Sequence, residues 1–249
     1  MKTRYIALIL VLLLMVLSSG NTSAQEKVTV NTGVDLYSRY VWRGLDIAST
    51  PSIQPTLSAD YCGFELGSWG AYTLSNQQSE SDEIDFWLSY GRGLENGFSF
   101  TVIATDYYFP NAGIRLFNFN NYDAVTSDST PDPGAHTIEL GATVTGPNSF
   151  PVGLSGYVNV YNDAGNNTYF QIDYPLSLEQ ADLNFFCGFA GGSKDNPGYY
   201  GTANLNAINM GVSAVREIKM NDTFSIPLTV SLIVNPQAEI SYLLVGMSF

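Results

Sequence analysis

Charged residues that could line a polar channel stand at the polar positions of segments in which apolar and polar residues alternate. They are two arginines, Arg39 and Arg43, and seven acids, Asp35, Glu65, Glu83, Asp85, Glu139, Asp173 and Glu217. An excess of acids inside a narrow pore favours cations, and two arginines facing acids would create a transverse field at a constriction. The alternative is that the acids pair with the arginines and with tyrosine hydroxyls, so that they fill the interior and nothing passes.

Residues for covalent chemistry are scarce. Enzymes that hydrolyse or transfer acyl chains need a nucleophile and usually a histidine base. His136 is the single histidine, it follows a long loop, and no G-x-S-x-G motif accompanies it. We therefore expect no catalytic residue, no cofactor and no enzyme activity. A lipid-modifying enzyme is the less favoured alternative.

The sequence holds no convincing metal site. Asp123, Asp128 and Asp132 lie in the longest loop, 110–135, but their spacing matches no defined calcium loop. That loop is expected to be a solvated surface loop, although it could also fold inward as a constriction. Cys62 and Cys187 form no metal signature, and free thiols are favoured over a disulfide because the two positions are far apart in the sequence.

The start of the chain predicts export. Lys2 and Arg4 precede an apolar run from Ile6 to Leu17, and small polar residues end at Ala24. This order is that of a cleaved secretory signal peptide, and the run is too short to cross a bilayer. We therefore expect residues 1–24 to be the signal peptide and residues 25–249 to form the folded domain, of about 225 residues.

Composition narrows the class of protein. Removal of Lys2 and Arg4 leaves 8 basic residues against 23 acidic ones, a net charge of −15. Such a chain is not expected to bind nucleic acid through its phosphates. Charged residues make up only 13% of the chain and aromatic residues also 13%, which suits an apolar outer surface with an aromatic belt.

Alternation with a period of two runs along nearly the whole chain and predicts strands. In the first segment Val30, Val34, Leu36, Tyr40 and Trp42 share one face, and Tyr40 and Trp42 are expected in an aromatic girdle near the outer rim. About twelve strands are predicted, near 28–43, 52–62, 63–74, 82–91, 97–109, 136–146, 151–162, 168–174, 182–191, 206–219, 223–234 and 238–249. Their lengths match those of strands that cross a bilayer at a tilt.

The connections and the polar face favour a barrel over a soluble sandwich. If both termini lie in the periplasm, the outer connections, such as 44–51, are on the whole longer than the inner ones, such as Cys62-Gly63. That asymmetry is typical of outer-membrane barrels. The polar face is mostly Gly, Ser, Thr, Asn and Tyr, whereas a solvated face would carry more Lys and Glu. We predict an all-β fold, an antiparallel up-and-down transmembrane barrel of about twelve strands.

The last strand, AEISYLLVGMSF, fits the assembly signal of such barrels. Gly246, apolar Met247 and terminal Phe249 stand where that signal places an aromatic residue two positions after a hydrophobic one. A final strand of this kind would be recognised by strand addition. The expected partners are therefore outer-membrane lipid and the barrel assembly machinery.

The segment VDLYSRYVWRGLDI, Val34–Ile47, with PSIQPTLS, Pro51–Ser58, resembles the first hairpin of the TorF-type porins. It is more similar still to uncharacterised outer-membrane barrels of the Bacteroidetes type. Further similarity lies in TDYYFPN (Thr105–Asn111), GYVNVYND (Gly156–Asp163) and SLIVNPQAE (Ser231–Glu239). The resemblance covers most of the mature chain and implies a barrel in the bacterial outer membrane.

Twelve strands would enclose a lumen between the filled interior of an eight-stranded barrel and the open channel of a porin. We therefore expect a narrow channel for passive diffusion of small polar solutes, with a leaning toward cations. The alternative is a non-conducting structural or adhesive surface barrel. The sequence leaves the solute and the oligomeric state open.

Overall fold

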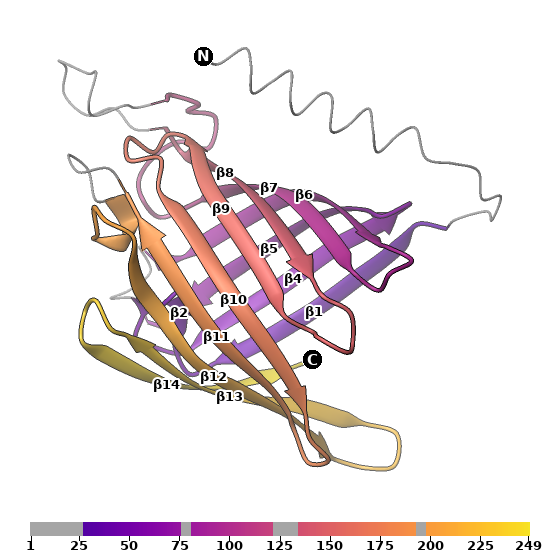
Figure 1. The fold of residues 1–249 in the computed structure, drawn as a ribbon. Coiled ribbons are helices and arrows are strands. Elements are labelled where there is room, and N and C mark those ends of the chain that lie inside the picture. The colour runs from indigo at the N-terminus through magenta and orange to yellow at the C-terminus, as the bar shows by residue number, and fades with distance from the viewer. Residues whose placement is uncertain (1–26, 76–80, 122–133, 193–197) are drawn as a thin grey trace.

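Twelve strands close into one antiparallel barrel (Figure 1). A computed structural model describes residues 27–75, 81–121, 134–192 and 198–249. The wall consists of β1 (Thr29–Tyr37), β4 (Ser52–Tyr61), β5 (Phe64–Thr73), β6 (Glu83–Gly93), β7 (Ser99–Tyr108), β8 (His136–Thr145), β9 (Gly153–Tyr161), β10 (Thr168–Ser177), β11 (Asp182–Gly191), β12 (Asn206–Lys219), β13 (Ser225–Asn235) and β14 (Ile240–Ser248). Each wall strand pairs with the next one along the chain, which confirms the predicted up-and-down barrel. The predicted signal peptide, residues 1–24, lies outside the described residues.

The barrel closes where the first and last strands meet. Asp35, Leu36 and Tyr37 pair with Ser248, Met247 and Gly246. The amide of Val34 donates to the carbonyl of Phe249 at 3.1 Å, and the amide of Phe249 donates to the carbonyl of Val34 at 2.9 Å. The terminal residue is thus a hydrogen-bonded part of the seam. Closure removes the strand edges that a flat sheet would expose.

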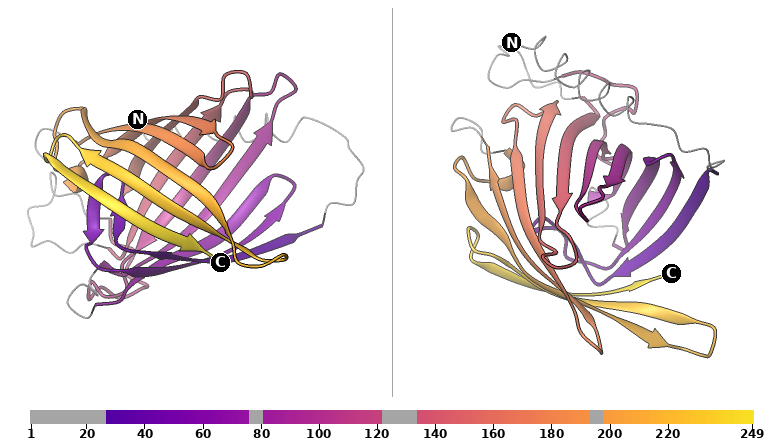
Figure 2. Two further views of the ribbon diagram at one scale, coloured as in Figure 1. Left: turned by 90° about the horizontal axis from the view of Figure 1, so that it is seen from below. Right: turned by 45° about the vertical axis from the view of Figure 1, so that its right-hand side comes forward.

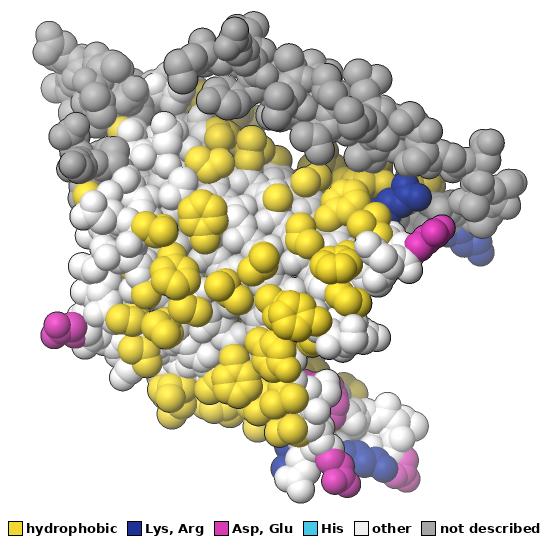
Figure 3. Space-filling view, in the orientation of Figure 1, with side chains coloured by type: hydrophobic (Ala, Val, Ile, Leu, Met, Phe, Trp, Pro, Cys, Tyr) yellow, Lys and Arg dark blue, Asp and Glu magenta, His cyan; other side chains and the backbone are white. Residues whose placement is uncertain are grey.

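The wall exposes apolar side chains on its outer face and buries polar side chains on its inner face, which is the reverse of a soluble protein. Leu66 and Leu243 point outward and are 63% and 64% exposed, whereas Glu83 points inward and is 4% exposed. Hydrophobic side chains spread over the outer face of the strands, and the charged side chains in that view gather near strand ends (Figure 3). Buried polar groups beneath an apolar surface are the pattern expected of a barrel that faces lipid.

Glycines make room for aromatic rings on the inner face. A Cβ atom on Gly67 would lie 2.2 Å from the indole of Trp87 on the neighbouring strand. The ring of Tyr157 lies over Gly141 in the same way. Tyr169 over Gly188 and Tyr37 over Gly246 are further examples. Large rings therefore fit inside a narrow barrel because the adjacent strand carries no side chain at that point.

The prediction of a first strand over 28–43 is wrong beyond Tyr37. After Ser38 and Arg39 the chain leaves the wall and forms a separate hairpin of β2 (Tyr40–Trp42) and β3 (Leu45–Ala48). The ladder stops at Ser38, whose amide donates to the carbonyl of Val245 at 2.8 Å. The alternating pattern continues into the hairpin, so periodicity alone could not locate this break.

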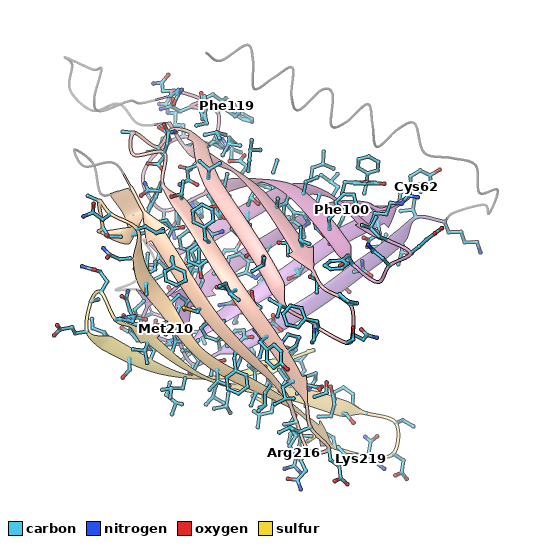
Figure 4. All side chains as sticks on the ribbon, viewed as in Figure 1. Cys62, Phe100, Phe119, Met210, Arg216 and Lys219 are labelled. Atoms are coloured by element: carbon cyan, nitrogen blue, oxygen red, sulfur yellow. The ribbon has the colours of Figure 1, made fainter. Side chains whose placement is uncertain are left out.

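The connections at the end of the barrel that holds Thr29 and Phe249 are short. The β4–β5 turn is Cys62-Gly63, with φ angles of 53° and 83°, as a two-residue hairpin turn of type I′ requires. The β12–β13 hairpin projects beyond its neighbours at this end (Figure 2). Figure 4 places Arg216 and Lys219 on that projection.

Candidate functional site

The β2–β3 hairpin folds into the barrel. Its tip, Arg43-Gly44, has φ angles of 48° and 78°, which again fits a type I′ turn. The carbonyl of Gly44 accepts a hydrogen bond of 3.0 Å from Nδ2 of Asn235 on β13. A Cβ atom on Gly44 would lie 1.9 Å from the carbonyl oxygen of Ile208 on β12. Only glycine can therefore seat the tip this closely against the wall.

Arg43 reaches from the hairpin to the opposite wall. Its Nη1 and Nη2 donate to the two carboxylate oxygens of Glu139 on β8, at 2.6 and 2.8 Å. Nη1 also donates to the hydroxyl of Tyr200 at 2.7 Å. This bidentate geometry is the strongest form of arginine–carboxylate contact. Because Arg43 contacts β8 while Gly44 contacts β12 and β13, the tip spans the lumen.

Aromatic rings surround the buried guanidinium. Its carbon lies 4.5 Å from the ring centre of Trp42, 4.3 Å from that of Tyr157 and 4.5 Å from that of Tyr169. The ring of Trp42 also stacks on that of Tyr200 in η2 (Gly198–Tyr200), with centres 5.7 Å apart. Burial raises the pKa of Tyr200 to about 12, so its hydroxyl is neutral at physiological pH. Cation–π contacts of this kind gain strength when water is excluded.

The base of the hairpin has its own anchors. The hydroxyl of Tyr40 donates to Glu83 at 2.8 Å, and its ring packs edge-on against Trp69 with centres 5.5 Å apart. Arg39 lies 3.7 Å from a carboxylate oxygen of Asp46 on the same hairpin, and its guanidinium lies 5.3 Å from the ring centre of Tyr242. Tyr40 and Trp42 therefore face the lumen, and the prediction that they form an outer girdle is wrong.

A cavity of about 600 Å³ lies beside the hairpin. Its lining comprises Tyr37, Arg39, Tyr40, Val41, Trp42, Gln54, Trp69, Asp85, Trp87, Phe186, Ser213, Ser231, Ile233 and Leu244. All three tryptophans of the chain belong to this set. The volume falls within the range of small-molecule sites, about 300–1,000 Å³.

The structure divides the predicted charged residues among different surroundings. It joins Arg43 to Glu139 and places Glu83 and Asp85 side by side near the base of the hairpin. Asp173 belongs to a separate network, where Gln171 and Asn184 each donate to it at 3.0 Å.

The remaining predicted charges lie apart from this group. Asp35 sits at the seam, and Glu65 lies on β5, paired in register with Ser89. Glu217 is exposed on the projecting hairpin, so its assignment to the lumen is corrected. The two arginines do not jointly face free acids, because each already has a carboxylate partner.

Several residues of the site were not predicted from the sequence. Tyr107 donates to Glu139 at 2.8 Å, and Tyr169 accepts a hydrogen bond of 2.8 Å from Asn209. Both tyrosines stand at inward positions of their strands, and the alternating sequence pattern was the signal that could have placed them in the lumen. The Arg43-Gly44 pair between two short apolar segments was the signal for the inner hairpin.

His136 holds the long outer loop against the barrel. Its Nδ1 lies 2.8 Å from an Asp106 carboxylate oxygen, and its Nε2 lies 2.6 Å from the carbonyl oxygen of Leu116. The ring of Phe119 stacks on the imidazole with centres 4.5 Å apart. Both ring nitrogens thus have partners in the loop and the adjoining strand.

The other predicted sites are resolved only in part. Asp123, Asp128 and Asp132 lie outside the described residues. Within the described ranges no group of three or more His, Cys, Asp or Glu residues could hold a metal ion. Cys62, in the exposed turn, and Cys187 on β11 are not joined in a disulfide. Among the described residues, no helix combines the length and apolar character needed to cross a membrane.

Comparison with known proteins identifies the family. No curated protein matches the chain. A family model described as a bacterial protein of unknown function (Gcw_chp) matches residues 21–196, which include the inner hairpin and most of the wall strands. The match extends over more than half of the sequence, and the chain therefore belongs to the Gcw_chp family.

Proposed function

We propose that the protein is a bacterial outer-membrane barrel whose lumen, narrowed by the β2–β3 hairpin, passes small polar solutes by diffusion. The outward apolar face and the closed ring of strands support insertion into a bilayer, because only helices and closed barrels satisfy all backbone groups in lipid. The predicted export signal, the final strand and the resemblance to TorF-type porins support the outer membrane as its location and the barrel assembly machinery as its partner.

The observation that carries the proposal is the hairpin tip across the lumen. Arg43 reaches Glu139 on one wall while Gly44 contacts β12 and β13 on the other. The tip leaves the cavity of about 600 Å³ on one side. A constriction of this kind restricts passage to small solutes, and the proposal involves no covalent chemistry and no cofactor.

Charge supports a preference for cations. The two arginines of the hairpin are each paired with one acid. Inward acids that have no basic partner, such as Asp173, leave the lumen with a negative excess in the described part of the chain. Such an excess raises the local concentration of cations.

A non-conducting barrel is the second candidate. The observation that favours it is the number of contacts that hold Arg43, which would make the hairpin a permanent plug. A plugged barrel would serve as a structural or adhesive surface protein.

Single-channel recording separates the two candidates. The refolded mature chain is inserted into a planar bilayer, and the conductance and the reversal potential across a potassium chloride gradient are measured. Small discrete steps with a cation-selective reversal potential are expected. The absence of steps, while folded protein is present in the bilayer, would favour the plug, and an anion-selective potential would refute the charge argument.

A further inference from the structure

We propose that the cavity beside the hairpin is a binding site for a small organic cation, an ammonium or protonated nitrogen carried on an apolar or aromatic body. The site goes beyond the proposed passage of small solutes, because binding needs no conduction. Three features of the lining carry it: the aromatic rings, the carboxyl group of Asp85, which has no basic partner in the described part of the chain, and an arginine that is already engaged.

The aromatic rings form much of the wall. Trp69 on β5 and Trp87 on β6 meet Tyr40 and Trp42 of the hairpin, and Phe186 lies on β11. The faces of such rings carry partial negative charge and attract cations, with tryptophan the most effective. Apolar side chains, Val41, Ile233 and Leu244, add surface for the body of a ligand.

Asp85 provides the charge. Its inward neighbours across the sheet are Trp69 and Tyr107, and Glu83 and Trp87 flank it on its own strand. Its Oδ1 atom is buried and has no hydrogen-bond partner among the described residues. None of the ion pairs in the described part of the chain includes Glu83 or Asp85. Two buried carboxyl groups this close do not both ionise without a cation beside them, and a cationic ligand would stabilise the charged form of Asp85.

The basic residue in the lining does not favour an anion. Arg39 is held by Asp46 and by the face of Tyr242. Arg43, the other hairpin arginine, is outside the lining and is bound to Glu139. A neutral sugar could use the rings and the serines, but it would not stabilise the charged form of Asp85. The observations therefore favour a cation.

Tryptophan fluorescence can test the site directly. Because the chain's only three tryptophans all line the cavity, the whole indole signal reports on it. The mature chain, refolded in detergent micelles, is titrated with benzyltrimethylammonium, benzyl alcohol, benzoate and glucose. We expect saturable binding of the cation and at least about tenfold weaker binding of the other three, as for loss of one charged hydrogen bond or ion pair.

Matched variants assign the effect to Asp85. Asp85→Asn should weaken cation binding about tenfold. Asp60→Asn makes the same charge change on β4, outside the lining, and should leave binding unaltered. Ser213→Phe keeps Asp85 but fills the cavity, and should abolish binding. Heat-modifiable gel mobility shows which variants are folded.

Defined outcomes would overturn the proposal. These are equal binding of benzoate or benzyl alcohol, preferential binding of glucose, or wild-type cation binding by folded Asp85→Asn. If Asp85→Asn fails to fold, the comparison of probes on the wild-type chain and the Ser213→Phe variant decides. Because the titration uses micelles, failure here leaves the conductance result untouched, and a silent bilayer leaves the binding result untouched.

Discussion

Arg43 and Glu139, 96 positions apart in the sequence, form a bidentate ion pair inside the barrel, with N–O distances of 2.6 and 2.8 Å. Arg43 stands on the inner hairpin and Glu139 on wall strand β8. Their side chains are 11% and 4% exposed, so little water screens the pair. The pair therefore fixes the position of the hairpin relative to the wall.

Loss of one partner should destabilise the barrel strongly. Glu139→Ala leaves a buried guanidinium without its carboxylate, and such a change costs about 3–5 kcal/mol. The free energy of unfolding in urea, measured in micelles, tests this. Arg39→Ala is the control, because its more exposed pair with Asp46 should contribute about 1 kcal/mol or less. Equal losses in both variants would contradict the buried pair.

Replacement of both partners should cost less than loss of Glu139 alone. In Arg43→Met/Glu139→Leu no uncompensated charge remains, and apolar replacements of buried pairs are often neutral or stabilising. The same unfolding measurement applies. If the double variant were as unstable as Glu139→Ala, the hairpin would depend on the pair for more than charge compensation.

Displacement of the hairpin tip should widen the lumen. In Gly44→Ala the new Cβ would lie 1.9 Å from the Ile208 carbonyl oxygen, so the tip has to leave its seat. Larger single-channel conductance is expected. Gly113→Ala is the matched control, because Gly113 has a similar φ angle, 77° against 78°, but its Cβ would meet nothing within 4 Å. Unchanged conductance in Gly44→Ala would argue against the hairpin as the constriction.

The seat of Trp87 depends on Gly67. Gly67→Ala should push the indole from the wall and lower the free energy of unfolding by about 1–3 kcal/mol, as overpacking does. A shift of the tryptophan emission maximum in the folded protein is the second readout. Gly93→Ala, on the adjacent strand with open space around its Cβ, should show neither effect. An unshifted spectrum in Gly67→Ala would refute the packing described.

The outward face can be tested with a charge. Leu88 is 54% exposed near the middle of β6, and Leu88→Arg should cost about 2–4 kcal/mol in a bilayer if it faces the hydrocarbon. The free energy of unfolding from lipid vesicles gives this value. Glu217→Arg on the projecting hairpin should change it little, because that position lies beyond the barrel wall. Equal tolerance of both changes would place Leu88 outside the lipid.

Local features were enough to predict the wall. Alternation of apolar and polar residues, as in Ile84–Tyr90, reports which face of a strand meets water, and short turn signals such as Cys62-Gly63 mark where the strand reverses. Both signals depend on neighbours in the sequence, so the strands and their order followed from the residues themselves. The family model adds no function to this picture.

The position of the first outer connection inside the barrel could be determined only from the tertiary structure. Tyr40 and Trp42 continue the alternation of β1, so the sequence alone assigned them to its lipid face. Their inward placement results from partners far away in the chain, with Tyr40 bound to Glu83 and Trp42 stacked on Tyr200. The sequence by itself thus determined a barrel with an apolar outside and an acidic inside. Only closure of the ring, which brings distant strands around one lumen, decided which charges pair, where the tryptophans gather and which segment lies across the lumen.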